Sequence, residues 1–483
     1  MSEGAIRKRG LTQISLGAAA ASVAFLSAAA PAHAHVSDRG FVMLLPTGHY
    51  LAGGAIAVAA SFAVLALMPA SVTGALAHGR LVLARGMPRG RTATSVVAFL
   101  AFIVLVLAGW LGSRDPLSNP LPLVVWTLMW VGLTLVQGLA GNLWWWIDPW
   151  YGPWRLMRRI AGDREGRSIL RLPAFVGYWP ALALFFGFAW FELIDPAPDD
   201  PARLATVAAV YYAANLVAMF VFGHDQWSRR GECLSAFFGL ISRYAPIGVE
   251  GEGREARTVL RFPGAALEAE RPLPPSGSLF LLLTLASVSF DGLSRTFFWL
   301  AANGVNPLEF PGRTAMTWTN TLGLLATFAA LAAVFLLAVV AGQSLTHSAV
   351  TLRRAGGLFV WSIVPIALAY HFSHYLTVLL VNGQYALVAL SDPFSAGWDL
   401  FGTADMQVVT GVTLGAEATW VVWNLQAGAI IGGHVLAVLA AHRIATRLHP
   451  QPAQGALSEL PLTVLMVAYT VFGLWLLSTP TGA

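Results

Sequence analysis

Three histidines lie inside apolar segments of the sequence that are long enough to cross a membrane. His371 and His374 lie in IVPIALAYHFSHYLTVLLV, and His434 lies in WNLQAGAIIGGHVLAVLAAH. An ionisable side chain is costly to bury in a bilayer, so a residue of this kind marks a candidate functional site. His371 and His374 are three positions apart, which places both on one face of a helix. Because imidazole binds metals and exchanges protons near neutral pH, the three residues indicate a metal site or a proton-transfer site.

An acidic and a basic residue lie at a similar depth in another apolar segment. Asp291 is near the middle of LTLASVSFDGLSRTFFWL, and Arg295 follows one helical turn further outward. At a rise of 1.5 Å per residue, His371 lies about 15 Å below the outer end of its predicted helix. Asp291 and His434 lie at a comparable depth. Two or three imidazoles with one carboxylate are a ligand set that suits Zn²⁺ or Fe²⁺.

These residues predict a site for a divalent metal ion within the membrane. In this interpretation His371, His374 and His434 are metal ligands. Asp291 is a further ligand or a general base, and Arg295 stabilises developing negative charge. Two alternatives stay open. The same residues line a path for protons, or they are structural, with Arg295 neutralising Asp291 and His434 bonding to a neighbouring helix.

The N-terminal residues predict a cleaved signal peptide over residues 1–34. A basic start, RKR, precedes the small-residue run LGAAAASVAFLSAAA and then APAHAH, which is the three-part layout of a secretory signal. Cleavage after Ala34 leaves His35 as the first residue, and cleavage after Ala32 leaves two histidines near the new N-terminus. A histidine beside a free amine suits Cu(II) or Ni(II). We therefore also predict His35 as a metal ligand.

The composition predicts an integral membrane protein with an all-α fold. Of the 483 residues, 57% are apolar and only 11% are charged, and the mean hydropathy is +0.66, far from the balance of a soluble domain. The net charge of +5 comes from arginines in short loops, so it does not indicate nucleic-acid binding. The single cysteine, Cys233, excludes an internal disulfide and a cysteine-rich metal site.

We expect residues 35–483 to form one transmembrane helix bundle of about ten spans, in contact with membrane lipids. The spans cover approximately 48–70, 94–113, 120–142, 172–193, 202–222, 278–300, 318–342, 356–381, 419–445 and 459–478. Arginine-rich loops alternate with acidic or neutral loops, and the positive-inside rule places every arginine-rich loop inside. After cleavage of the signal, both termini then lie outside.

Two long loops are expected to carry structure of their own. The inner segment 223–277 contains CLSAFFGLISRYAPIG, which predicts an amphipathic helix lying at the inner interface. The outer segment 382–418 is too apolar for a disordered loop. We expect it to form a cap over the outer end of the eighth span.

A second polar group is expected near the inner face. Its members are His224, Asp225, Glu232, Cys233 and Asp148. The neighbouring run NLWWWIDPWYGPW is typical of an aromatic belt at the membrane interface, and we interpret it so. His442 is expected to be an ordinary interfacial residue.

Several common catalytic motifs are missing. The sequence contains no GxxxxGK[ST], HExxH, GxSxG or CxxCH, so nucleotide hydrolysis, zincin proteolysis, the lipase-type serine mechanism and covalently attached haem lack support. Haem held by two facing intramembrane histidines needs no motif and is an alternative cofactor.

Three segments resemble a family of bacterial polytopic membrane proteins labelled fenitrothion hydrolase. They are SVSFDGLSRTFFWL, IVPIALAYHFSHYLTVLLVNGQYALVALSDPF and WNLQAGAIIGGHVLAVLAAH. The resemblance implies an enzyme of the bacterial inner membrane, with both termini periplasmic, that hydrolyses a P–O bond of an apolar organophosphate triester. A metal held by the three histidines would supply hydroxide for that reaction. Two other functions fit the same residues: inward transport of copper or another metal, and electron transfer through bound haem.

Overall fold

The computed structural model describes residues 47–68, 74, 79–86, 89–163, 168–251, 253–306, 312–413, 415–449 and 451–479. The predicted signal peptide, residues 1–34, and the predicted ligand His35 lie outside these residues. Ten helices in the described part of the chain are long and apolar enough to cross a membrane. The prediction of an all-α transmembrane bundle with about ten spans is confirmed.

The ten candidate spans follow the order predicted from the sequence. They are α2 (Thr47–Leu67), α4 (Arg91–Leu111), α5 (Pro120–Pro122) continued by η1 (Leu123–Leu133) and α6 (Thr134–Ala140), η2 (Ala174–Val176) with α9 (Trp179–Leu193), α10 (Pro201–Phe222), α13 (Pro275–Ser294), α15 (Arg313–Leu345), α16 (Leu352–Phe359) continued by η6 (Val360–Ser362) and α17 (Ile363–Ser391), α18 (Ala416–Leu448), and α19 (Pro452–Ser478).

Shorter elements connect these spans. The helices are α7 (Trp144–Ile147), α8 (Tyr151–Ile160), α11 (His224–Arg230), α12 (Cys233–Ile241), α14 (Phe297–Ala302), and the 3₁₀ turns η3 (Ser242–Tyr244), η4 (Gly253–Glu255), η5 (Leu267–Ala269) and η7 (Thr410–Thr413). The strands are β1 (Arg80–Arg85), β2 (Ile247–Glu250) and β3 (Arg257–Arg261).

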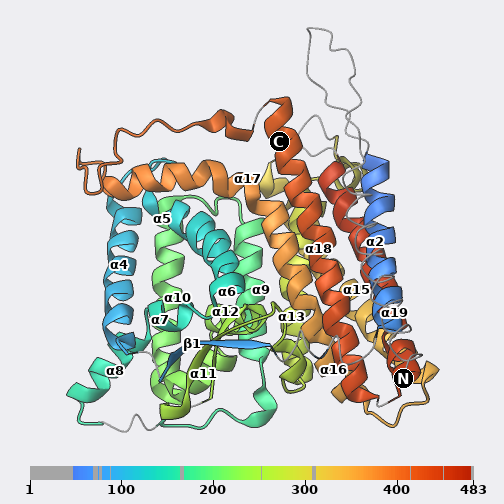
Figure 1. Ribbon diagram of the computed structural model, residues 1–483. Coiled ribbons are helices and arrows are strands. Elements are labelled where there is room, and N and C mark those ends of the chain that lie inside the picture. The colour runs from blue at the N-terminus through green and yellow to red at the C-terminus, as the bar shows by residue number, and fades with distance from the viewer. Residues whose placement is uncertain are drawn as a thin grey trace, which may run out of the picture. The chain divides into compact units, whose positions relative to one another are not determined.

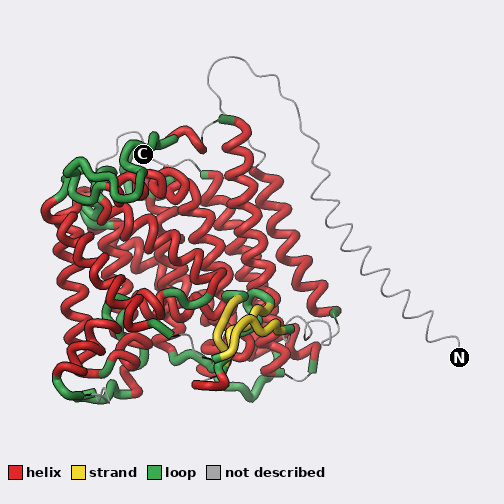
Figure 2. Tube along the Cα trace, turned by 60° about the vertical axis from the view of Figure 1, so that its left-hand side comes forward, coloured by secondary structure: helices red, strands yellow, loops and turns green. Residues whose placement is uncertain are grey.

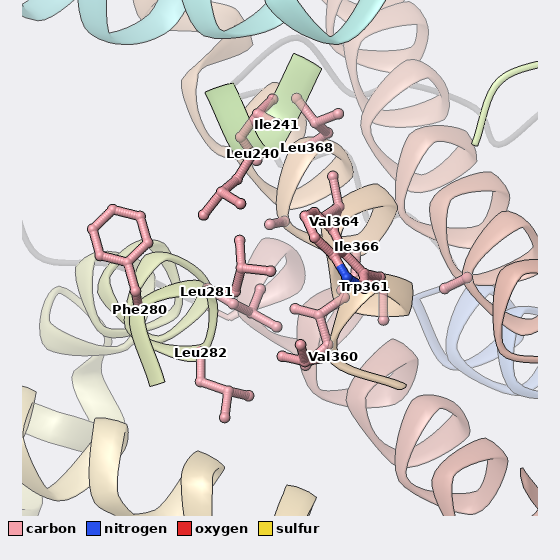
Figure 3. Close-up of a cluster of buried hydrophobic side chains, with 14 of the residues drawn as sticks. Leu240, Ile241, Phe280, Leu281, Leu282, Val360, Trp361, Val364, Ile366 and Leu368 are labelled. Atoms are coloured by element: carbon pink, nitrogen blue, oxygen red, sulfur yellow. The ribbon is translucent and has the colours of Figure 1, made fainter. Parts of the chain in front are cut away.

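The helices α13 and α17 lie at the centre of the bundle. In their most apolar windows 78% and 89% of the residues are buried, against 50% or less in the other eight candidate spans. Helix α17 packs on α18, η1 and α13, and α19 packs on α18, α15 and α2 (Figure 1). Figure 3 shows this core where Leu281 of α13 approaches Ile241 of α12 and Val364 of α17. Most side chains in the central parts of α13 and α17 are therefore shielded from bulk water.

Three strands form a small antiparallel sheet at one end of the bundle (Figure 2). Their order is β1-β3-β2, with Arg80 opposite Arg261 and Ile247 opposite Leu260. We call this the sheet end. The opposite end, which carries residues 392–413, we call the loop end (Figure 1). The sheet was not predicted, because its strands are short and come from two loops far apart in the sequence.

The segment 223–277 was expected to lie at the interface, but its apolar part is buried. Helix α12 covers Cys233–Ile241, and seven of its nine residues are buried in the core. Phe237 packs against the rings of Trp130 and Phe185. The apolar run that suggested an amphipathic surface helix is thus a core helix, with residues buried all around it.

At the loop end, α17 continues further than predicted. It ends at Ser391, so the first third of the expected loop 382–418 is helical. Ala386 and Ala389 in this extension pack on Leu123, which explains why the helix continues beyond the bilayer-length segment. Figure 1 shows this last part of α17 crossing the loop ends of α4 and α5.

A glycine allows the close approach of α17 and α18. A Cβ atom on Gly433 would lie 2.4 Å from Cβ of Ala369 and 3.0 Å from the carbonyl oxygen of Pro365. At the preceding residue, Gly432, a Cβ atom would meet nothing within 4 Å. Substitutions at these two neighbouring glycines can therefore distinguish the effect of close helix packing from the effect of helix propensity.

We expect Gly433→Ala to destabilise the bundle because the added methyl group forces α17 and α18 apart. Overpacking of this kind costs about 1–3 kcal/mol. Gly432→Ala is the control and is expected to be neutral or slightly stabilising, by up to about 1 kcal/mol, because alanine favours a helix. Thermal unfolding of both variants in detergent measures the difference. Equal midpoints would show that the close helix contact is wrong.

Candidate functional site

Asp291 is a buried carboxylate with three hydrogen-bonding side chains around it. It lies near the loop end of α13 and is 2% exposed. Its Oδ2 atom is 2.7 Å from Nε2 of His374 and accepts from the hydroxyl of Tyr375 at 2.9 Å. Its Oδ1 atom pairs with Arg295, with 3.0 Å to the nearest guanidinium nitrogen. The predicted pairing of Asp291 with Arg295 is confirmed, and His374 joins it.

A second carboxylate reaches the same group from another helix. Glu192 lies in the last turn of α9, and its Oε1 atom is 3.2 Å from the Tyr375 hydroxyl oxygen. A phenol has one proton to donate. Since the hydroxyl of Tyr375 lies within hydrogen-bonding distance of both carboxyl groups, both contacts are hydrogen bonds only if one carboxyl group carries a proton. We call Glu192, Asp291, Arg295, His374 and Tyr375 the loop-end site.

Two residues of this site, Tyr375 and Glu192, were not among the site residues predicted from the sequence. Tyr375 follows His374 directly but was not predicted as a site residue, and Glu192 was not singled out. A signal for Glu192 was present, because a carboxylate in the apolar run ALALFFGFAWFEL is unusual for a membrane span. Its position near the end of that run made it resemble an ordinary boundary residue.

The predicted ligand His371 faces a different helix from His374. Its Nε2 atom lies 2.9 Å from the carbonyl oxygen of Trp130 in η1, and its ring meets those of Trp130 and Tyr375 edge-on, with 4.9 Å between ring centres in each pair. The carbonyl of Trp130 lies in an 11-residue π-helical stretch. Wide helical turns of that kind occur often at functional sites. A cavity of about 10 Å³, enough for about one water molecule, lies beside His371.

The predicted ligand His434 is fully buried in α18. Its Nδ1 atom lies 2.8 Å from the carbonyl oxygen of Ile430, one turn away on the same helix. The structural alternative expected a hydrogen bond to a neighbouring helix instead. Its Nε2 atom has no hydrogen-bond partner among the described residues. The ring lies next to those of Tyr370 and Tyr469, at 6.1 and 6.3 Å between centres. Two tyrosine rings, which we call the tyrosine cage, thus lie beside an imidazole whose Nε2 atom has no partner among the described residues.

The three imidazoles predicted as metal ligands do not converge on one point. His374 binds Asp291, His371 binds a backbone carbonyl of η1, and His434 lies in the tyrosine cage. In the described part of the chain, no group of three or more His, Cys, Asp or Glu side chains has an arrangement that suits a metal ion. The side chains therefore do not fit the predicted metal centre, and we derive no chemical step through a metal.

The second polar group, at the sheet end, is partly confirmed and partly corrected. His224 and Asp148 form a buried pair with 2.7 Å between Nε2 and Oδ2, and Arg91 lies 3.6 Å from the same oxygen. The neighbouring tryptophans Trp144 and Trp150 are 7% and 3% exposed. The interpretation of the whole run as an interfacial belt is wrong for these two residues, because their rings pack in the core, against Phe238 and Tyr212 respectively.

Glu232, the other acidic member of that group, has a structural role. Its carboxylate accepts from the backbone N–H groups of Leu234 and Ser235, at 2.8 and 2.6 Å. It thereby caps the N-terminus of α12. The hydroxyl of Tyr211 donates to the same carboxylate.

The described elements define a polytopic membrane protein with a buried carboxylate–histidine–tyrosine site near one end. No protein-family model, curated protein or solved structure matches the chain. The resemblance to the fenitrothion hydrolase family therefore stays a prediction.

The His224–Asp148 pair is expected to make the stability depend on pH. Burial opposes charge on the ring, but hydrogen bonds to Asp148 and Asp225 outweigh it, and the pKa of His224 is raised. A raised pKa in the folded state stabilises the fold fully below the unfolded histidine value of about 6.5. This stabilisation is lost as the pH rises through the raised value.

We therefore expect His224→Gln to lower the thermal midpoint more at pH 6 than at pH 9. His49→Gln, at an exposed histidine, is the control and is expected to change neither midpoint. An equal loss for His224→Gln at both pH values would contradict the proposed protonation of His224.

Proposed function

We propose that the loop-end site transfers protons and that the protein moves protons across its membrane. The observation that carries the proposal is the position of the Tyr375 hydroxyl between Asp291 and Glu192, at 2.9 and 3.2 Å. Two carboxyl groups joined by one phenol share a proton that either of them can hold. Buried chains of Asp, Glu and His are the groups that carry protons in membrane pumps and transporters.

His374 supports the proposal as the route from the surface to the buried carboxylate. Its side chain is 25% exposed, whereas that of Asp291 is 2% exposed. Imidazole gains and loses a proton near neutral pH. Arg295, at 56% exposed, keeps a positive charge beside Asp291 when His374 is neutral.

A row of polar groups leads from the loop-end site towards the middle of the bundle. His371 and Tyr375 are in edge-on contact, and Tyr370 lies one turn below His374 on α17. The Tyr370 hydroxyl donates to the carbonyl of Tyr469 at 2.6 Å, and the Tyr469 hydroxyl pairs with Ser289. The free Nε2 of His434 beside these rings is a proton acceptor at the same level. Water molecules between these groups would complete the route.

Hydrolysis of an apolar phosphotriester is a second candidate function, supported by the exposed edge of the same site. His374, oriented by Asp291, is arranged as a general base that removes a proton from water. The resulting hydroxide would attack phosphorus, the bond to the aryl oxygen would break, and the aryl oxide would leave. The neighbouring guanidinium of Arg295 would stabilise the negative charge that develops on the phosphoryl oxygen. The resemblance stated above favours this reaction, and the proposal requires no metal ligand.

We expect Asp291→Asn to reduce proton flux at least tenfold, because an amide cannot take up the shared proton. The purified protein is placed in vesicles with a pH-sensitive dye inside, and a potassium gradient with valinomycin supplies the driving voltage. Asp195→Asn is the matched control, since Asp195 is also 2% exposed and paired with an arginine, Arg203, at 2.6 Å. Wild-type vesicles no more permeable to protons than empty ones, or an Asp291→Asn variant as active as wild type, would refute proton transfer through this site.

The hydrolase candidate predicts release of nitrophenolate from a nitrophenyl dialkyl phosphate by the detergent-purified protein. His374→Ala is expected to abolish the release because it removes the general base, and Asp195→Asn is expected to retain it. Absorbance of the product measures the rate. A wild-type rate equal to that of buffer alone removes this candidate and leaves the proton-transfer proposal unaffected.

A further inference from the structure

A group of buried polar atoms without hydrogen-bond partners lies towards the sheet end of α15 and α19. These atoms, identified among the described residues, are Nε2 and Oε1 of Gln343, Oε2 of Glu459 and Oγ1 of Thr463. The three residues are 6%, 0% and 3% exposed. Buried polar groups are nearly always hydrogen-bonded, and several without partners at one level indicate a water molecule or an ion.

Contacts between the helices bring these residues to one level. Glu459 and Thr463 are four residues apart on α19 and lie on the same helix face. On α15, a Cβ atom at Gly342 would lie 2.0 Å from the carbonyl oxygen of Ser458. The backbones of α15 and α19 are therefore in contact at Gly342 and Ser458, the residues that precede Gln343 and Glu459 in the sequence. Figure 1 shows α15, α18 and α19 running side by side.

A histidine from the third helix completes the group. Nδ1 of His442 on α18 lies 2.7 Å from Oε1 of Glu459, and the side chains are 7% and 0% exposed. His442 is thus buried, and the expectation that it is an ordinary interfacial residue is wrong. The next residue, Arg443, binds the carboxylate of Glu268 at 2.7 and 2.8 Å. Arg443 thus pairs with Glu268, and His442 contacts Glu459.

The donor atoms of this group suit a small, hard cation. They comprise one carboxylate oxygen, one amide oxygen and one hydroxyl oxygen, and oxygen ligands of this kind bind hard cations. Glu459 supplies a single negative charge. A monovalent cation neutralises it, whereas a divalent cation would leave an uncompensated positive charge in the bundle, which is costly.

We propose that Gln343, Glu459 and Thr463, with His442 beside them, form a binding site for a small monovalent cation, a proton or a sodium ion, together with its water. We call this the sheet-end cation site. It shares no residue with the loop-end site and goes beyond the proton transfer proposed there, because it places a second ion-binding position at the opposite end of the bundle. A cation held by Glu459 takes the place of hydrogen bonds to the unpartnered oxygens, and its water accepts from Nε2 of Gln343.

The test compares two threonines on the same helix. Thr463→Val removes a hydroxyl without a partner, whereas Thr470→Val removes a buried hydroxyl that donates to the carbonyl of Met466 at 2.8 Å. The two variants have the same change in shape and differ in the proposed ligand. Gln343→Leu is a second variant that removes the amide while keeping the side-chain volume similar.

Thermal unfolding in sodium chloride and in choline chloride tests sodium as the ion. We expect sodium to raise the midpoint of wild type and of Thr470→Val by about 2 °C or more, as ligand binding to the folded state does. The shift is expected to be absent in Thr463→Val and Gln343→Leu. This result identifies sodium as the cation.

Infrared spectroscopy in sodium-free buffer tests a proton as the ion, held on the carboxyl group of Glu459 and hydrogen-bonded to water. A protonated carboxyl band that disappears in Glu459→Gln, and that moves in Thr463→Val but not in Thr470→Val, identifies a bound proton with its water. If neither the sodium-dependent midpoint nor this band differs between Thr463→Val and Thr470→Val, the sheet-end cation site does not exist. Size-exclusion profiles that match wild type ensure that all variants compared are folded.

Discussion

The neutralisation of one buried charge is the constraint on which the loop end of the structure depends. Asp291 lies on α13, one of the two most buried helices, where an unpaired carboxylate is very unfavourable. Arg295, His374 and Tyr375 supply the compensating hydrogen bonds from α13 and α17. These contacts determine how α17 is rotated, because His374 and Tyr375 must face α13 and α9. Once α17 has that rotation, His371 faces η1 and binds the carbonyl of Trp130.

Three groups of polar side chains lie at successive levels along the bundle. At the loop end, two carboxyl groups share the hydroxyl of Tyr375, and the histidine beside them reaches the surface. In the middle, tyrosine rings surround the free nitrogen of His434. Towards the sheet end, Glu459 has a histidine on one oxygen and, among the described residues, no hydrogen-bond partner on the other. Helices α17, α18 and α19 connect these levels, and glycines such as Gly433 keep them close enough for the polar side chains to meet. The proposed proton transfer and the proposed cation site thus lie along neighbouring helices of the bundle.

The fold was predictable from the sequence because it depends mainly on the length and hydropathy of continuous segments. Ten apolar runs of bilayer length are visible without knowledge of packing, and all ten became helices. The depth of Asp291 was predicted less well, because the expected span 278–300 placed it near the middle, whereas it lies in the last turn of α13, which ends at Ser294. Helix rotation was not predictable. His371 and His374 share a face only broadly, and the angle between them is enough for one to reach η1 and the other α13. Their spacing led to the expectation of a common metal site. Because the two side chains reach different helices, they do not form that site in the structure. Glu192 and Glu459 were missed because each lies near the end of an apolar run, where charged residues are ordinary. The three-stranded sheet was missed because its strands are short and β1 pairs with β3 across more than 170 residues of sequence.

The shared proton at Tyr375 is the central claim, and infrared spectroscopy of the purified protein at neutral pH tests it most directly. The account predicts the band of a buried, protonated carboxyl group that disappears in Glu192→Gln or in Asp291→Asn. It also predicts that this band shifts in Tyr375→Phe but not in Tyr385→Phe, a change on the same helix outside the loop-end site. A spectrum in which neither carboxyl variant removes a protonated band would contradict it, because both carboxyl groups would then be ionised and the Tyr375 hydroxyl could satisfy only one of them.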